Sequence, residues 1–334
     1  MTLSRHDVDL ITALFRYRYL TSGQLARLMD RSGQNVRRAM RLRLVKDGYV
    51  TRMQASRNEE AAYCLGNVGF AFMAEELGCA VADLPFSRKI RTVRSFFWKH
   101  TVLVNDVRIA FDLATASPST PIHIKRTIPE WELVPGAGGR RNRPHHLRFV
   151  LSERLEGADG TMHPHRPDCL FLVHPASADG PVVALFTECD RGTETMRRIR
   201  GKLQAYWLYF RRRRFVDAFG AMSMRVLFVL DGGERDDRRI RSMQAELGKF
   251  VASRSAFQLR DRGQTYDIVP EDFSHVFRFA RARDLSPETA LRAAIWHGPD
   301  ADAPQRPLFL PPVAREESDA DTHRAAATAL EASA

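Results

Sequence analysis

Three carboxylates and two further polar residues are spaced so that they could form one catalytic site. Asp168 begins an apolar segment, and Glu188 and Asp190 end the next apolar segment 20 and 22 residues later. Carboxylates at the ends of neighbouring strands can converge, and carboxylate oxygens are preferred ligands of Mg²⁺ and Mn²⁺. Lys202 and Tyr206 lie one helical turn apart, so both side chains share one face. The pattern predicts a catalytic site of these five residues, with the three carboxylates as metal ligands.

The same carboxylates also have a structural interpretation. Arg191, Arg197 and Lys202 are close enough in sequence to pair with Glu188 or Asp190, and a helix start at residues 192–193 favours nearby negative charge. A non-catalytic nucleic-acid cleft is a third interpretation, because nine basic residues between positions 191 and 214 oppose a single acid. The sequence leaves metal-dependent cleavage, structural pairing and a nucleic-acid cleft open.

The cysteines and histidines of the sequence do not indicate a second metal site. The four cysteines show no CxxC spacing, so we expect neither a zinc site nor a disulfide framework. His145, His146, His163 and His165 fall in a connection rich in proline and glycine, without an HExxH pattern. These features are typical of a solvated loop rather than of a metal cluster.

A basic segment near the N-terminus predicts a helix that reads DNA. Seven basic residues and one acid lie between positions 31 and 52, while Val36, Met40 and Leu44 are spaced to face a core. In the major groove Gln and Asn can recognise adenine, and Arg can recognise guanine or a phosphate. A solvated helix face is the alternative explanation. We assign base contacts to Gln34, Asn35 and Arg38 and phosphate contacts to Arg37, Arg41, Arg52 and Arg57, and Arg43 completes the predicted DNA-binding set.

Local patterns place this helix in a winged helix-turn-helix over residues 1–80. Apolar periodicity, capping residues and alternating segments predict helices at 5–17, 24–29, 34–46 and 68–77, and wing strands at 48–52 and 62–65. Three helices joined by short turns and followed by a strand pair are typical of this DNA-binding module.

The rest of the chain predicts a second domain. After a basic linker at 81–94, the order of helices and strands indicates an α/β domain with a mixed sheet over 95–298, so the whole chain is expected to be α+β or α/β. We predict helices at 95–116, 194–213 and 236–252, and strands at 122–126, 146–151, 169–173, 182–187 and 225–230. Residues 299–334 are small, charged and rich in alanine, and we expect a disordered tail.

The charge of the chain favours a nucleic-acid partner, and its hydropathy argues against a membrane. The 334-residue chain carries a formal net charge of +11, which favours binding to phosphate backbones. No apolar run approaches the ~20 residues of a membrane-spanning helix, and the first ten residues lack a signal-peptide core. We therefore expect a cytoplasmic protein without a membrane partner.

The spacing of the candidate catalytic residues resembles the PD-(D/E)xK restriction-endonuclease-like superfamily. The resemblance lies in Pro167-Asp168, Glu188-Cys189-Asp190 and Lys202-x-x-x-Tyr206. It implies a restriction-endonuclease-like mixed sheet and a site that would use Mg²⁺ or Mn²⁺ if it is active. Asp190 stands where that superfamily has its catalytic lysine, and Lys202 stands where it often has glutamine. Whether this chain is an enzyme is therefore left open.

The whole arrangement resembles the bacterial replication-relaxation family of plasmids and mobile elements. Besides the residues above, the resemblance rests on His100, Asn105 and Asp106 in one predicted helix and on Trp131 and Glu132, and it covers roughly residues 5–300. It implies a protein that binds double-stranded DNA, by sequence or by structure, in plasmid or mobile-element replication, mobilisation or transcriptional control. A metal-dependent endonuclease or nickase and a protein-docking adaptor are the alternatives. Replication or mobilisation proteins are implied as further partners, and pairing into a homodimer is left open.

Overall fold

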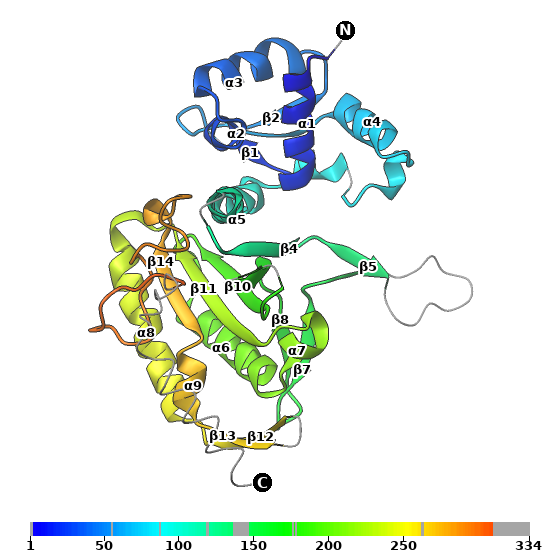
Figure 1. Ribbon diagram of the computed structural model, residues 1–334. Coiled ribbons are helices and arrows are strands. Elements are labelled where there is room, and N and C mark those ends of the chain that lie inside the picture. Colours follow the sequence, from blue (N-terminus) through cyan, green and yellow to red (C-terminus); the bar gives the residue numbers. More distant parts are fainter. Residues whose placement is uncertain are drawn as a thin grey trace, which may run out of the picture.

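The computed structural model shows a mixed α/β protein with two groups of elements joined by one long helix, α5 (Figure 1). It describes residues 3–309 except 55, 87, 118–119, 136–146, 176, 178 and 262–263. The smaller group is N-terminal and mainly helical. The larger group surrounds a five-stranded sheet. The sheet is mixed, as the sequence predicts, but the strand predicted at 146–151 lies outside it as part of a separate strand pair.

The N-terminal elements follow the predicted order closely. They are α1 (Arg5–Tyr17), β1 (Leu20–Thr21), α2 (Ser22–Met29), α3 (Gly33–Ala39), a π-helical segment (Met40–Leu44), β2 (Val50–Met53), β3 (Ala62–Leu65) and α4 (Asn67–Glu76). The three strands form an antiparallel sheet in the order β1-β3-β2. Strand β1 is too short to show an alternating pattern, and the sequence did not predict it.

Helix starts in this group are fixed by local hydrogen bonds. The side chain of Ser4 accepts from the backbone N–H of Asp7, and the Asp7 carboxylate accepts from the backbone N–H of Ser4. Thr21 and Gln24 form the same reciprocal pair at the start of α2. Such capping boxes satisfy backbone donors that have no partner inside the helix. The local sequence therefore determines where both helices begin.

The predicted helix over 34–46 is only partly α-helical. It is an α-helix to Ala39 and then widens, with the N–H of Val45 donating to the carbonyl of Met40, five residues back, at 2.9 Å. Val36, Met40 and Leu44 are fully buried in the N-terminal core. The predicted apolar face is confirmed, whereas an uninterrupted α-helix is wrong for this segment.

The segment predicted as a linker is packed against the N-terminal core. Leu84, Phe86 and Ile90 are buried, and the hydroxyl of Tyr19 donates to the carbonyl of Ile90 at 2.6 Å. Two short 3₁₀ helices, Val81–Asp83 and Arg88–Thr92, carry the chain to α5. The segment was predicted to be a linker from its basic residues, whereas its apolar residues Leu84, Phe86 and Ile90 are buried.

Helix α5 (Ser95–Ala116) has the predicted bounds and fixes the two groups to each other. Its Asn105 is fully buried and donates from Nδ2 to the carbonyls of Tyr17 (2.8 Å) and Tyr19 (2.7 Å). The Oδ1 atom of Asn105 accepts from Arg108, whose guanidinium lies 4.4 Å from the centre of the Tyr17 ring. One buried amide thus donates to the carbonyl of the last residue of α1 and to a carbonyl just beyond it.

The main sheet has the strand order β14-β11-β10-β9-β4. Its strands are β4 (His123–Pro129), β9 (Cys169–His174), β10 (Val183–Asp190), β11 (Ser223–Leu230) and β14 (Phe277–Arg281). Strand β11 pairs in parallel with β10 and with β14, whereas β9 pairs antiparallel with β10 and with β4. Strand β14 was not predicted, because its arginines interrupt the apolar pattern.

Side chains alternate between two layers across the sheet. Leu170 and Leu172 of β9 pack in the core shared with α6 (Met196–Arg211), α8 (Asp236–Ala252) and α9 (Pro270–Ser274). Phe171 and Val173 pack on the other face against α5 and residues 285–309. The remaining elements are α7 (Arg214–Phe219), the 3₁₀ helices Gly233–Arg235 and Ala282–Asp284, and the strand pairs β5 (Leu133–Pro135) with β6 (Leu147–Phe149), β7 (Glu153–Glu156) with β8 (Met162–His165) and β12 (Phe257–Asp261) with β13 (Gln264–Ile268).

The predicted disordered tail is wrong for residues 299–309. Leu308 and Phe309 are buried against the sheet, Arg225 donates a hydrogen bond to the carbonyl of Leu308, and a β-bridge joins Trp296 to Arg306. The side chains of Leu308 and Phe309 supply the burial that holds this segment. Residues 310–334 lie outside the described residues. No helix in the described part of the chain is long and apolar enough to cross a membrane.

Loss of the Asn105 amide should destabilise the protein. Asn105→Ala leaves the carbonyls of Tyr17 and Tyr19 without this donor, so the free energy of unfolding should fall by about 1–3 kcal/mol in urea denaturation. Asn58→Ala, at an exposed position, should change it by less than about 0.5 kcal/mol. Equal effects of both substitutions would contradict the role given to Asn105.

Candidate functional site

Successive side chains of β10 point to opposite faces of the sheet, and this determines on which face each polar residue lies. Phe186 belongs to the α6 face of the sheet, so Glu188 and Asp190, two and four residues later, share that face. Cys189 lies on the opposite, α5 face. Glu188, Cys189 and Asp190 are all buried, so the two carboxylates must find partners within the protein.

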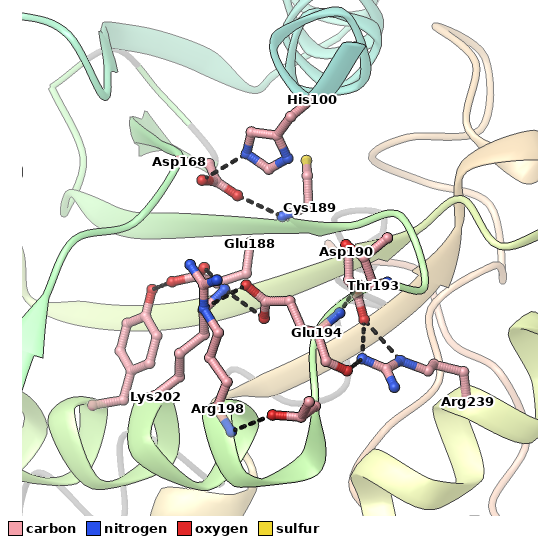
Figure 2. A network of polar contacts seen from close by, with 12 residues as sticks. His100, Asp168, Glu188, Cys189, Asp190, Thr193, Glu194, Arg198, Lys202 and Arg239 are labelled. Carbon is pink, nitrogen blue, oxygen red and sulfur yellow. Dashed lines mark hydrogen bonds and ion pairs between the residues drawn. The ribbon is translucent and has the colours of Figure 1, made fainter. Parts of the chain in front are cut away.

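Glu188 is held by the two residues that the sequence placed beside it. Lys202 Nζ donates to Glu188 Oε2 at 2.7 Å (Figure 2). The hydroxyl of Tyr206 donates to Glu188 Oε1 at 2.7 Å. Burial raises the pKa of Glu188 to about 7, although Lys202 and Tyr206 act in the opposite direction. The structural pairing of Glu188 with Lys202 is therefore confirmed.

Lys202 also connects Glu188 to a second carboxylate. Its ammonium lies 2.9 Å from Glu194 Oε2, while Arg198 Nε lies 3.1 Å from Glu194 Oε1. Burial alone would lower the pKa of Lys202, but the nearby carboxylates outweigh burial and raise it. Lys202 is therefore a fixed cation between two acids.

Asp190 caps α6 and pairs with a distant arginine. Its Oδ1 atom accepts from the backbone N–H groups of Thr193 (3.2 Å) and Glu194 (3.4 Å), so the predicted helix-capping role is confirmed. Arg239 of α8 donates to Asp190 Oδ2 through Nε at 2.7 Å (Figure 2). This partner was missed because Arg239 follows Asp190 by 49 residues, and no local pattern brings them together. Gly192 makes the turn in between with φ +74°, a conformation that favours glycine.

Asp168 is held on the side of α5. His100 Nε2 lies 3.0 Å from Asp168 Oδ1, and the backbone N–H of Cys189 donates to Asp168 Oδ2 at 2.8 Å (Figure 2). Burial raises the pKa of Asp168, but the hydrogen bond and charge of His100 outweigh it, and the pKa is lowered overall. The same pair raises the pKa of His100 against the opposing effect of burial. The sequence indicated His100 only through a family resemblance, because no local pattern links it to Asp168, 68 residues away.

This arrangement does not fit the predicted Mg²⁺ or Mn²⁺ site. All six carboxylate oxygens of Asp168, Glu188 and Asp190 already interact with hydrogen-bonding or cationic groups of the protein. Within the part of the chain that the structure describes, no three His, Cys, Asp or Glu side chains are grouped as metal ligands. Lysine and arginine supply the positive charge that a metal would otherwise provide.

The carboxylates lie beside a cleft of about 690 Å³ between the two groups of elements. Its walls come from α5, the start of β9, the end of β10, α6 and the loop after α1. His165 also lines it, and here the prediction of a solvated loop is wrong. His165 lies on β8, is buried and stacks on Tyr209 with ring centres 4.1 Å apart. His145 and His146 lie outside the described residues.

The predicted DNA-binding residues lie together on the N-terminal group. All of them are exposed: Gln34, Asn35, Arg37, Arg38, Arg41, Arg43, Arg52 and Arg57. Arg43 forms an ion pair with Asp7 at 3.0 Å, so part of its charge is neutralised by α1. Among described residues, no acid forms an ion pair with Arg37, Arg38 or Arg41.

The fold and these contacts define a mixed α/β protein with an exposed basic helix and a set of internally neutralised carboxylates. A family model described as Replication-relaxation matches residues 11–223, more than half of the chain. The chain belongs to the replication-relaxation family. No curated protein and no solved structure matches the chain. The matched range includes α3 and every residue of the carboxylate cluster except Arg239.

The pH dependence of stability tests the burial of Glu188. Its pKa rises from 4.5 to about 7 on folding, so its stabilising contribution is complete below about pH 4.5 and is lost as pH rises through about 7. Glu188→Gln keeps an oxygen for Tyr206 and removes this titration. The unfolding free energy of the variant relative to wild type should therefore rise between about pH 4.5 and 7. A difference that is constant with pH would contradict the assignment.

Divalent metal should not bind at the carboxylates as they are arranged. Metal that binds only the folded state raises the melting temperature. Because the carboxylate oxygens are already occupied, we expect millimolar Mg²⁺ or Mn²⁺ to leave the melting temperature unchanged. A saturable rise that disappears in Glu188→Gln would show that Lys202 gives way to metal, and would reverse this conclusion.

Proposed function

We propose that this protein binds double-stranded DNA through its N-terminal group and acts in the replication or mobilisation of plasmids or other mobile elements. In this proposal residues 3–80 work as a winged helix-turn-helix, with α3 and the π-helical segment in the major groove and β2–β3 as the wing. The family membership supports the biological context.

One observation carries the DNA-binding proposal. Arg37, Arg38 and Arg41 are exposed, while Val36 and Met40 of the same segment are fully buried. The segment is therefore anchored by its apolar side and presents arginines to solvent. Arginine on a rigid helix can bind phosphates and guanine without first breaking an internal ion pair.

The surrounding elements support the same orientation. Gln34 and Asn35 lie in the first turn of α3, where the side chains of a reading helix approach base edges. Arg52 on β2 and Arg57 in the following loop are also exposed. These two arginines are proposed to contact phosphates beside the groove.

Removal of the α3 arginines should weaken DNA binding and its dependence on salt. For Arg37→Ala/Arg38→Ala/Arg41→Ala, the slope of log affinity against log salt should decrease by about one for each lost phosphate contact. Gel-shift titrations of a duplex at several salt concentrations measure both quantities.

A matched variant controls for the change in net charge. Arg235→Ala/Arg238→Ala/Arg241→Ala also removes three positive charges, from exposed positions at and beside α8. It should bind duplex almost as tightly as wild type. If both variants lose affinity equally, general charge explains binding and the assignment to α3 fails.

A further inference from the structure

Two exposed phenylalanines stand at the cleft. Phe96 and Phe97 are 51% and 58% exposed, and no other phenylalanine among the described residues is so exposed. They occupy the first turn of α5, both line the cleft, and their ring centres lie 5.7 Å apart. Aromatic rings exposed beside a cleft usually mark a binding surface.

The charge around these rings favours a nucleic acid. Arg191 and Arg198 line the same cleft, and the Arg198 side chain is 69% exposed. Arg94 is exposed and directly precedes α5. Proteins that hold unpaired strands combine aromatic rings, on which bases stack, with basic side chains that follow the phosphates.

The acids of the cleft floor do not oppose this partner strongly. Glu188 is paired with Lys202, Glu194 with both Lys202 and Arg198, and Asp168 with His100. Their negative charge is therefore balanced within the protein. Arg198 takes part in this pairing through Nε, yet its side chain is 69% exposed, and the half-buried Arg191 lines the same cleft.

We propose that the cleft binds an unpaired DNA strand, with bases stacked on Phe96 and Phe97 and phosphates contacted by Arg191 and Arg198. This inference rests on the proposed function for DNA as the partner, but it uses a different surface from α3. The protein would then grip duplex and unpaired DNA at adjacent sites, as expected at a junction where a duplex has opened.

The test compares single-stranded and duplex DNA. Fluorescence anisotropy with a labelled oligothymidylate should show that Phe96→Ala/Phe97→Ala weakens single-strand binding by about tenfold or more, the loss typical of one or two unstacked bases. Duplex affinity should change by less than about twofold, which lies within the usual effect of surface substitutions. Both side chains are exposed, so the melting temperature should be retained.

Two controls separate stacking from general apolar contact. Phe96→Tyr/Phe97→Tyr keeps both rings and should keep single-strand binding, and Met222→Ala removes an exposed apolar side chain from another site without effect. Unchanged single-strand affinity in the alanine variant, or none in wild type, overturns the inference. A dimer that dissociates in the alanine variant while single-strand binding persists would instead assign the phenylalanines to a second copy of the chain.

The two proposals fail separately. Loss of duplex binding in the α3 variant with single-strand binding retained supports the role of α3 and a separate surface for the single strand. Loss of single-strand binding in the phenylalanine variant then supports the cleft. If the α3 variant keeps duplex binding but the phenylalanine variant loses single-strand binding, the proposed function of α3 fails and the cleft assignment stands.

Discussion

The burial of Asn105 is the constraint on which the arrangement of the two groups depends. Its amide donates to backbone carbonyls at the end of α1 and just beyond it, while its helix packs against the main sheet. An unsatisfied buried carbonyl is costly, so α5 cannot slide or rotate without breaking these bonds. This joint holds the exposed arginines of α3 and the cleft in one fixed relation.

Charge is distributed unevenly over this frame. Buried carboxylates at the ends of β9 and β10 are matched by nearby cations from α5, α6 and α8, so the interior is close to neutral. Among the described residues, exposed side chains that include the arginines of α3 carry part of the net charge of +11. The same pairing distinguishes this cluster from a metal centre. In a metal centre the carboxylate oxygens would point at the ion, whereas here they point at lysine and arginine.

Local patterns were enough to predict the longer helices and most strands of the main sheet, but not the short helices α7 and α9. Apolar periodicity specifies α1, α5 and α8, and a capping residue fixes the start of α1. The short spacing between Glu188 and Lys202 indicated their pairing. Long-range contacts were not predictable: Arg239 reaches Asp190 from another helix, and His100 reaches Asp168 across 68 residues. Strand β14 was missed because its arginines interrupt the apolar pattern. Residues 299–309 were missed because only Leu308 and Phe309 near their end are apolar and buried, and the surface that buries them is formed by distant residues. The carboxylates were recognised as a cluster, but their partners decide that metal does not fit.

The most direct test of the account asks which surface touches duplex DNA. Leu42 is 61% exposed beside the α3 arginines, and Leu77 is 53% exposed at the end of α4. A photoreactive amino acid at position 42 should cross-link to duplex DNA under ultraviolet light, and the same group at position 77 should not. Cross-linking from position 77 alone, or from neither position while the protein remains bound, would contradict the claim that α3 enters the groove.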